Sequence, residues 1–159
     1  MIAKNSTVSL AYSVVVPVRN EAGNIASLIA EISAVMAGLD AAYEIIYVDD
    51  GSTDGTFEIL SRLHAADPRL RVIQLRRNFG QTAAFAAGFA RARGRIIVTA
   101  DGDLQNDLRD IPRMVDKLEE GYDIVCGWRK ARKDRWLSRR RSPRSPRRHS
   151  PSRPEFLPH

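Results

Sequence analysis

Two aspartates separated by one residue follow an apolar, β-type run, and their spacing is suited to metal chemistry. The run at 96–100 (IIVTA) leads directly into Asp101-Gly102-Asp103. Alternate residues leaving a strand can turn both carboxylates toward one point, and Gly102 lets the backbone bend between them. Two close carboxylates are stable together only when a cation neutralises them or one takes a proton. Oxygen ligands favour Mg²⁺ or Mn²⁺, which also bind the phosphates of substrates. The alternative interpretation is a solvated acidic loop that caps a helix.

Two further polar clusters come after β-type runs. Asp49 and Asp50 follow 43–48 (YEIIYV), and an ionised carboxylate there could accept a hydrogen bond from a nucleobase N–H or a ribose hydroxyl. The alternative is a turn with a helix cap, which taken alone is the better interpretation. In the segment 17–24 (PVRNEAGN), Glu21 could contact a ribose or simply favour the start of the next helix.

A basic cluster follows the third β-type run. Arg76 and Arg77 could face a diphosphate, and Gly80 could let backbone amides approach it; the alternative is a pair of solvated arginines. Arg129 could reach the same pocket from the end of 123–127. No G-x-G-x-x-G or P-loop motif follows any of these runs, which argues against a dinucleotide cofactor or a P-loop. No histidine lies near a predicted strand end, which argues against Ser-His-Asp and His-metal chemistry.

The elements that must position these residues alternate regularly. Apolar β-type runs alternate with segments of helical periodicity, each separated by Gly, Pro or Asp. This order predicts an α/β fold with a parallel sheet covered by helices on both faces. Ligands in such sheets bind outside the carboxyl ends of the strands. The pattern predicts strands at 12–16 (ended by Pro17), 43–48, 70–75, 95–100 and 123–127, and helices at 23–38, from Ser52 or Thr53 to 66, 80–93 and 111–120.

The charge is unevenly distributed along the chain. Residues 129–159 contain 12 of the 25 Lys and Arg residues and two of the 19 Asp and Glu residues, so this segment is near +10 and residues 1–128 are near −4. Residues 135–159, rich in Arg, Ser and Pro, have little to bury and are predicted to be a disordered basic tail. No run reaches the ~18 apolar residues of a membrane span. The single cysteine, Cys126, lies in an apolar run and is predicted to be a small buried side chain.

Five blocks of this sequence, taken together and in this order, resemble the family 2 glycosyltransferases with the Rossmann-like GT-A fold. The nearest branch is that of the polyprenyl-phosphate sugar transferases, similar to dolichol-phosphate mannose synthase. The blocks are VVVPVRNEAGNI, EIIYVDDGSTDGT, LRRNFGQTAAFAAGF, IIVTADGDLQND and IVCGWR. The resemblance covers about residues 12–129 and ends near Asp134. It implies an incomplete GT-A domain at 1–134, followed by the basic tail.

The resemblance also implies roles for individual residues. Asp101 and Asp103 would hold Mg²⁺ or Mn²⁺ against the diphosphate of the donor, and Arg129 would face phosphate. The remaining residues of the nucleotide pocket would be Pro17, Arg19, Glu21, Asp49, Asp50, Asn78, Gly80 and Gln105.

The function implied is transfer of a sugar, with inversion, from a nucleoside-diphosphate sugar to a polyprenyl phosphate, with transfer impaired if the chain is truncated. The implied location is peripheral, on the cytoplasmic face of a membrane, and the resemblance allows a homo-oligomer in the full-length family. The alternative is a nucleotide-binding α/β module whose Arg-Ser tail binds RNA or another polyanion by counterion release. Trp136 and Phe156 do not make a stacking platform, so specific nucleic-acid recognition is not expected.

Overall fold

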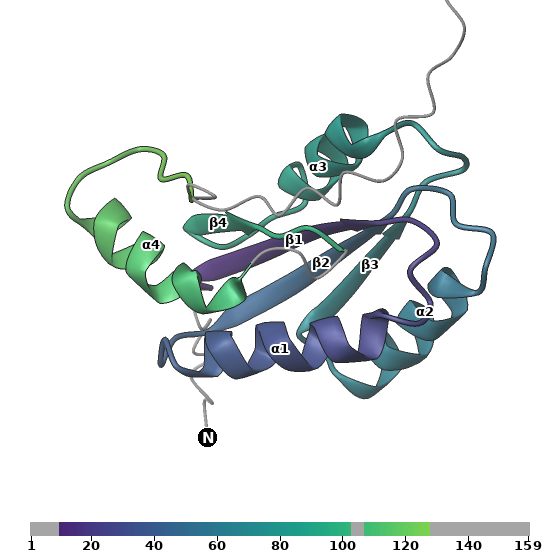
Figure 1. Cartoon of the computed structure of the whole chain (residues 1–159), viewed down its shortest axis with the longest axis horizontal. Coiled ribbons are helices and arrows are strands. Elements are labelled where there is room, and N and C mark those ends of the chain that lie inside the picture. The colour runs from purple at the N-terminus through teal and green to yellow at the C-terminus, as the bar shows by residue number, and fades with distance from the viewer. Residues whose placement is uncertain (1–9, 103–106, 128–159) are drawn as a thin grey trace, which may run out of the picture. The chain divides into compact units, whose positions relative to one another are not determined.

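In a computed structural model of the protein, residues 10–102 and 107–127 are described, and they form an alternating α/β arrangement (Figure 1). The predictions for Asp103, Gln105, Arg129 and the basic tail lie outside these residues. The elements are β1 (Tyr12–Val18), α1 (Ile25–Ala37), β2 (Tyr43–Asp49), α2 (Thr56–Ala66), β3 (Leu70–Gln74), α3 (Gln81–Phe89), β4 (Ile96–Thr99), the 3₁₀ turn η1 (Leu108–Asp110) and α4 (Ile111–Glu119).

The four strands form one parallel sheet in the order β3-β2-β1-β4. The two central strands are buried along their whole length, which explains why their sequences are continuous apolar runs rather than alternating ones. Because all four strands are parallel, their carboxyl ends lie at one edge of the sheet. The predicted polar clusters therefore come to the same edge.

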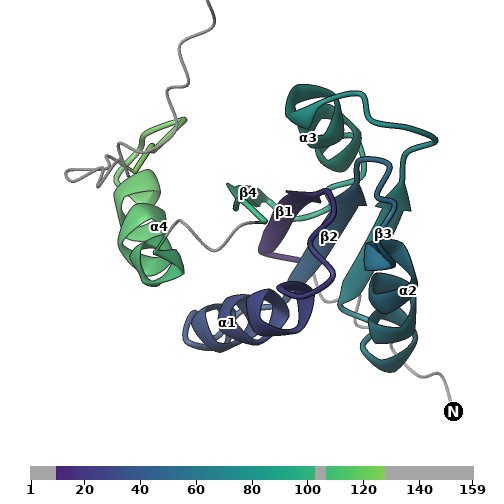
Figure 2. The same ribbon diagram turned by 45° about the vertical axis from the view of Figure 1, so that its right-hand side comes forward.

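Helices cover both faces of the sheet, as predicted. One face packs against α1, α2 and α4 through a core that includes Leu28, Ile32 and Leu60. The other face packs against α3, where Ala84 meets Val15 and Ile46. Figures 1 and 2 show α3 on the side of the sheet opposite α1 and α2. The sequence prediction of the fold class is confirmed.

Pro17 does not end the first strand, contrary to the prediction, because β1 continues to Val18. Ile96 N donates to Ala11 O, and Ala100 N donates to Val15 O. The backbone N–H and C=O groups of odd-numbered residues in β1 therefore point toward β4. Pairing with β4 stops at Val15, so the missing N–H of Pro17 falls beyond the β4 ladder and no sheet hydrogen bond is lost.

The predicted fifth strand at 123–127 is wrong: the structure gives these residues no regular secondary structure. Ile124 is 78% exposed, and Cys126 is exposed rather than buried. Val125 lines an apolar groove between β4 and α4 that also includes Met114. β-type composition indicates only that a segment suits a half-buried pleated surface, and a strand also needs hydrogen-bonding partners along its length.

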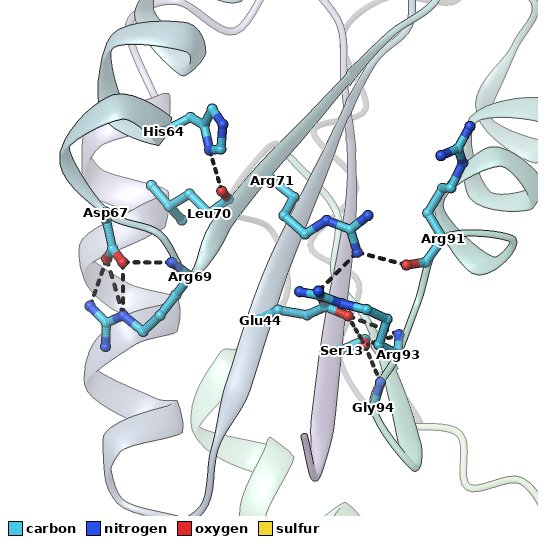
Figure 3. A network of polar contacts seen from close by, with 10 residues as sticks. All are labelled: Ser13, Glu44, His64, Asp67, Arg69, Leu70, Arg71, Arg91, Arg93 and Gly94. Atoms are coloured by element: carbon cyan, nitrogen blue, oxygen red, sulfur yellow. Dashed lines mark hydrogen bonds and ion pairs between the residues drawn. The ribbon is translucent and has the colours of Figure 1, made fainter. Parts of the chain in front are cut away.

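A buried polar network holds the amino-terminal ends of β1 and β2 to the segment after α3 (Figure 3). Ser13 and Glu44 are opposite each other in the sheet, and the Ser13 hydroxyl donates to Glu44 Oε1 at 2.7 Å. Glu44 is 1% exposed and pairs with Arg93 at 2.7 Å and Arg71 at 2.9 Å. Gly94 N donates to the same Ser13 hydroxyl at 2.8 Å. This network fixes the point where the chain enters β4.

Helix α3 lies so close to the sheet that a side chain at Gly88 has no room. A Cβ atom there would stand 2.3 Å from Val15 Cγ1 and 3.3 Å from Val48 Cγ2. We expect Gly88→Ala to lower the free energy of unfolding by about 1–3 kcal/mol, because overpacking outweighs the better helix propensity of alanine. Chemical denaturation measures this, with Gly23→Ala as the control, because a Cβ at Gly23 meets nothing within 4 Å. Equal stability of the two variants would contradict the prediction.

Candidate functional site

The loops after β1 and β2 are tied together at the carboxyl edge of the sheet. Asn20 N donates to Ser52 Oγ at 2.9 Å, and Asn20 Oδ1 accepts from Thr53 N at 2.8 Å. Asn20 has a φ of 56°, a left-handed conformation that asparagine adopts more readily than most residues. Glu21 N donates to Thr56 Oγ1 at 2.9 Å, which adds a second link. The two loops thus form one hydrogen-bonded wall.

Because of these links, Ser52 and Thr53 do not cap the second helix as predicted. The helix begins at Thr56, and its N-cap residue is Gly55 with a left-handed φ of 88°. Asp54 links the start of this helix to the loop after β1. Its Oδ1 accepts from the Thr56 hydroxyl at 2.6 Å, and its Oδ2 accepts from Ala22 N at 3.2 Å. The hydrogen bond from the Thr56 side chain lowers the pKa of Asp54.

The two predicted aspartates at the end of β2 have different surroundings. Asp49 is fully buried, and its Oδ1 accepts from Ser52 N at 3.0 Å. Its Oδ2 is also buried and has no hydrogen-bond partner among the described residues. Asp50 is also buried and lies one residue beyond the strand. A ligand role for either residue stays a prediction.

Asp50 holds the loop that follows β3. Its Oδ1 accepts from Phe79 N at 2.7 Å and its Oδ2 from Gly80 N at 2.9 Å. Asn78 Oδ1 also accepts from Gly80 N, at 2.9 Å. Gly80 has a φ of 92°, a conformation that favours glycine. A Cβ there would meet nothing within 4 Å, so the backbone conformation and not a lack of space requires glycine. One carboxylate thereby ties the end of β2 to the start of α3.

At the end of β4, the Asp101 carboxylate is linked to the start of α3. Its Oδ1 accepts from Gln81 Nε2 at 3.0 Å. The next residue, Gly102, packs against β1: a Cβ there would stand 2.8 Å from Val18 Cγ1 and 2.9 Å from Pro17 O. Glycine is therefore needed at 102 for close approach to β1, whereas the sequence had suggested a backbone bend.

The structure brings the described candidates to one edge of the sheet, where each closes or follows a strand. Pro17 is buried in β1, Arg19 is exposed, and Glu21 is half-buried with its side chain accepting from Asn24 Nδ2 at 2.6 Å. Asp103, Gln105 and Arg129 lie outside the described residues. Sequence analysis missed the linking residues Asn20, Thr56 and Gln81. A high density of Asn, Asp, Ser and Thr after two strands was a signal for the first two, and Gln81 had no such signal.

Of the two predicted cation ligands the structure describes Asp101, and the described residues contain no group of three or more His, Cys, Asp or Glu side chains that could hold a metal ion by themselves. Asp101 places a carboxylate at the sheet edge where ligands of parallel α/β folds bind. Its oxygens are the type of ligand that Mg²⁺ and Mn²⁺ prefer. Gln81 orients one of these oxygens, as residues around metal ligands commonly do.

Comparison with known families agrees with this geometry. The family model for glycosyl transferase family 2 matches residues 13–158. The chain belongs to glycosyl transferase family 2. The match begins within β1 and includes β2, β3, β4 and the polar loops at the carboxyl ends of the strands. It extends beyond Asp134, where the resemblance was expected to end.

Similar family 2 proteins include transferases named for polyprenyl phosphates. The chain is 48% identical over 128 residues to a dodecaprenyl-phosphate galacturonate synthase of Rhizobium johnstonii, covering 79% of this chain and 38% of the relative. It is 40% identical over 134 residues to an undecaprenyl-phosphate 4-deoxy-4-formamido-L-arabinose transferase of Aeromonas hydrophila, covering 84% of this chain and 41% of the relative. The chain thus spans about two fifths of the length of these curated relatives.

Solved structures support the GT-A-like arrangement of this family 2 chain. A mannosyltransferase of Pyrobaculum calidifontis, in complex with GDP-Man and Mn²⁺, has a TM-score of 0.55 and 29% identity, covering 69% of this chain and 32% of that one. TarS of S. aureus, in complex with UDP-GlcNAc, has a TM-score of 0.53 and 25% identity, covering 68% of this chain and 32% of that one.

Proposed function

We propose that this chain is the nucleotide-sugar-binding part of a glycosyltransferase that moves a sugar from a nucleoside-diphosphate donor to a polyprenyl phosphate. The observation that carries this proposal is the convergence of three loops on one sheet edge, with Asp50 and Asp101 both hydrogen-bonded to the segment at the start of α3. The relatives named as polyprenyl-phosphate transferases support the acceptor, and the solved neighbours with nucleotide sugars support the donor.

Different residues at the carboxyl edge of the sheet bind different parts of the donor. The loops after β1 and β2, which carry Arg19, Glu21 and Asp50, bind the nucleoside. Asp101 and Asp103 hold a Mg²⁺ or Mn²⁺ ion, which the Mn²⁺ in the mannosyltransferase structure supports. The ion supplies charge stabilisation for the leaving nucleoside diphosphate. Phosphate contacts by Gln105 and Arg129 are part of this proposal and rest on the family resemblance alone.

The chemistry requires little acid–base assistance from the protein. A phosphate oxygen of the acceptor is already anionic near pH 7, so in-line attack on the sugar needs no strong general base. The described residues include one histidine, His64, and its Nδ1 lies 2.5 Å from Leu70 O at the start of β3, away from the carboxyl edge. The protein's task is to orient the donor and to offset the repulsion between two anionic substrates.

The acceptor places the reaction at a membrane surface, so we propose peripheral association with the cytoplasmic face. Within 10–102 and 107–127, none of the helices is long and apolar enough to cross a bilayer.

Titration calorimetry with UDP- and GDP-sugars, with and without Mn²⁺, tests the donor site. We expect binding to weaken at least about fivefold without the metal, the lower end of usual coupling between two ligands. Asp101→Asn should produce the same loss in the presence of Mn²⁺.

Asp116→Asn is the matched control, because Asp116 is exposed on α4 and is not one of the residues assigned to the donor site. Metal-independent binding, or an equal loss in both variants, would refute the proposed donor site. The rival function, polyanion binding by the basic tail, would instead appear as salt-sensitive RNA binding that is lost when 136–159 are deleted.

A further inference from the structure

A short segment after β3 connects the two carboxylates that the proposed function assigns to opposite ends of the donor. Phe79 N and Gly80 N donate to Asp50, which is proposed to lie at the nucleoside end. The Gln81 side chain donates to Asp101, which is proposed to lie at the diphosphate end. Three consecutive residues therefore contact both carboxylates.

Phe79 is the first residue of this segment, its backbone N–H donates to Asp50, and its side chain is not buried. The ring is 46% exposed, although its backbone is fixed by a 2.7 Å hydrogen bond to a buried carboxylate. The Arg77 guanidinium lies over the ring, 4.5 Å from its centroid. The exposed part of the ring offers apolar surface that a ligand can cover.

The backbone beneath this ring has little freedom to move. A Cβ at Gly51 would stand 2.5 Å from the Arg77 carbonyl carbon and 2.6 Å from Asn78 N, so the loops after β2 and β3 are in direct contact. The hydrogen bonds from Phe79 N and Gly80 N to Asp50 also hold the residues that follow Asn78. Because the backbone of Phe79 is already constrained, ordering it costs little conformational entropy when a ligand packs against the ring.

We propose that Phe79 is the platform on which the base of the nucleotide stacks, with Arg77 holding the ring in position. This inference rests on the proposed function, since it assigns one contact within the donor site. Aromatic rings suit this role because every nucleobase has a π-face. The cation–π contact of Arg77 with the ring is already present without a ligand, so it positions the ring. Phe79 therefore strengthens nucleotide binding while discriminating little between uracil and guanine.

The test compares Phe79→Ala with Phe79→Tyr and Phe89→Ala by calorimetry in Mn²⁺, using UDP, GDP and inorganic pyrophosphate. Phe89 is the matched control because it is 43% exposed and lies at the far end of α3. We expect Phe79→Ala to weaken binding of UDP and GDP about tenfold while leaving pyrophosphate binding unchanged. Phe79→Tyr should bind like the unmodified protein, and so should Phe89→Ala.

Each other outcome overturns the inference in a recognisable way. Unchanged UDP binding in Phe79→Ala would exclude stacking, and an equal loss for UDP and pyrophosphate would mean that the ring only supports the loop. In a separate co-sedimentation measurement, Phe79→Ala could fail to sediment with anionic phospholipid vesicles while still binding UDP. That result would make Phe79 a membrane contact instead. If the unmodified protein binds none of the three ligands in Mn²⁺, the proposed function itself fails.

Discussion

Replacing Glu44 by alanine is expected to lower the free energy of unfolding by about 1–3 kcal/mol, the usual cost of leaving buried hydrogen-bond donors without their acceptor. Glu44 is almost fully buried, and its loss leaves Arg71 and Arg93 without their shared carboxylate. Arg93 N, which donates to Glu44 Oε1 at 2.8 Å, also loses an acceptor. Urea or guanidinium denaturation measures the change.

Glu58→Ala serves as the control, because this exposed glutamate lies in the first turn of α2, where a carboxylate contributes less than about 1 kcal/mol. A Glu44→Ala protein as stable as the control would show that the network contributes nothing to folding.

The same residue makes stability depend on pH in the acid range. Burial by itself raises the pKa of Glu44, but hydrogen bonds from Arg93, Ser13 and Arg71 outweigh it and lower the pKa from 4.5 to about 2. Because the folded pKa is depressed, the contribution is fully present above about pH 4.5 and is lost as the pH falls toward 2. The stability difference between the unmodified protein and Glu44→Gln should therefore narrow across this window. A constant difference from pH 6 to pH 2.5 would contradict the assignment.

Asp50→Asn is expected to release the segment that carries Phe79, even though the side chain keeps its size. Asparagine has one acceptor oxygen and an NH₂ group, so one of the two backbone donors now faces a donor. The lost hydrogen bond costs about 1–3 kcal/mol where it falls on Phe79 N, and less on Gly80 N, which also donates to Asn78 Oδ1. Hydrogen exchange should show lost protection at the Phe79 and Gly80 amides, and calorimetry should show weakened binding of the nucleotide in Mn²⁺.

Asn78→Ala is the matched control for this change. Its oxygen accepts from the same Gly80 N, but Asn78 is exposed, so water can replace the lost bond. Full protection of both amides in Asp50→Asn would show that the loop is held by its other contacts.

Much of the architecture followed from local patterns. The continuous apolar runs in β1 and β2 predicted buried parallel strands, and the helical spacing of Ile25, Leu28 and Ile32 predicted the helix that covers them. Parallel strands share a carboxyl edge, so the meeting of Asp50 and Asp101 at one edge also followed from the order of the elements. These features depend on periodicity and chain order, which the sequence contains directly.

Other features required the tertiary structure. The 123–127 run has the composition of a strand but pairs with none of the described strands, since pairing depends on a partner edge that composition does not encode. The link between Ser13, Glu44 and Arg93 joins residues up to 80 positions apart, so no local pattern could reveal it. The same holds for Gln81 with Asp101 and for Asp50 with Phe79.

The sequence by itself determined the type of the four strands and of the four α-helices, the parallel sheet with helices on both faces, and the edge at which the acidic clusters collect. Only the tertiary structure decided what these carboxylates bind: Asp49 turns into the interior, Asp50 holds the loop after β3, and Asp101 meets the start of α3. The physical reason is range. Hydrophobic periodicity acts between neighbours in the chain, whereas a hydrogen bond needs donor and acceptor within about 3 Å, a distance set by how whole elements pack.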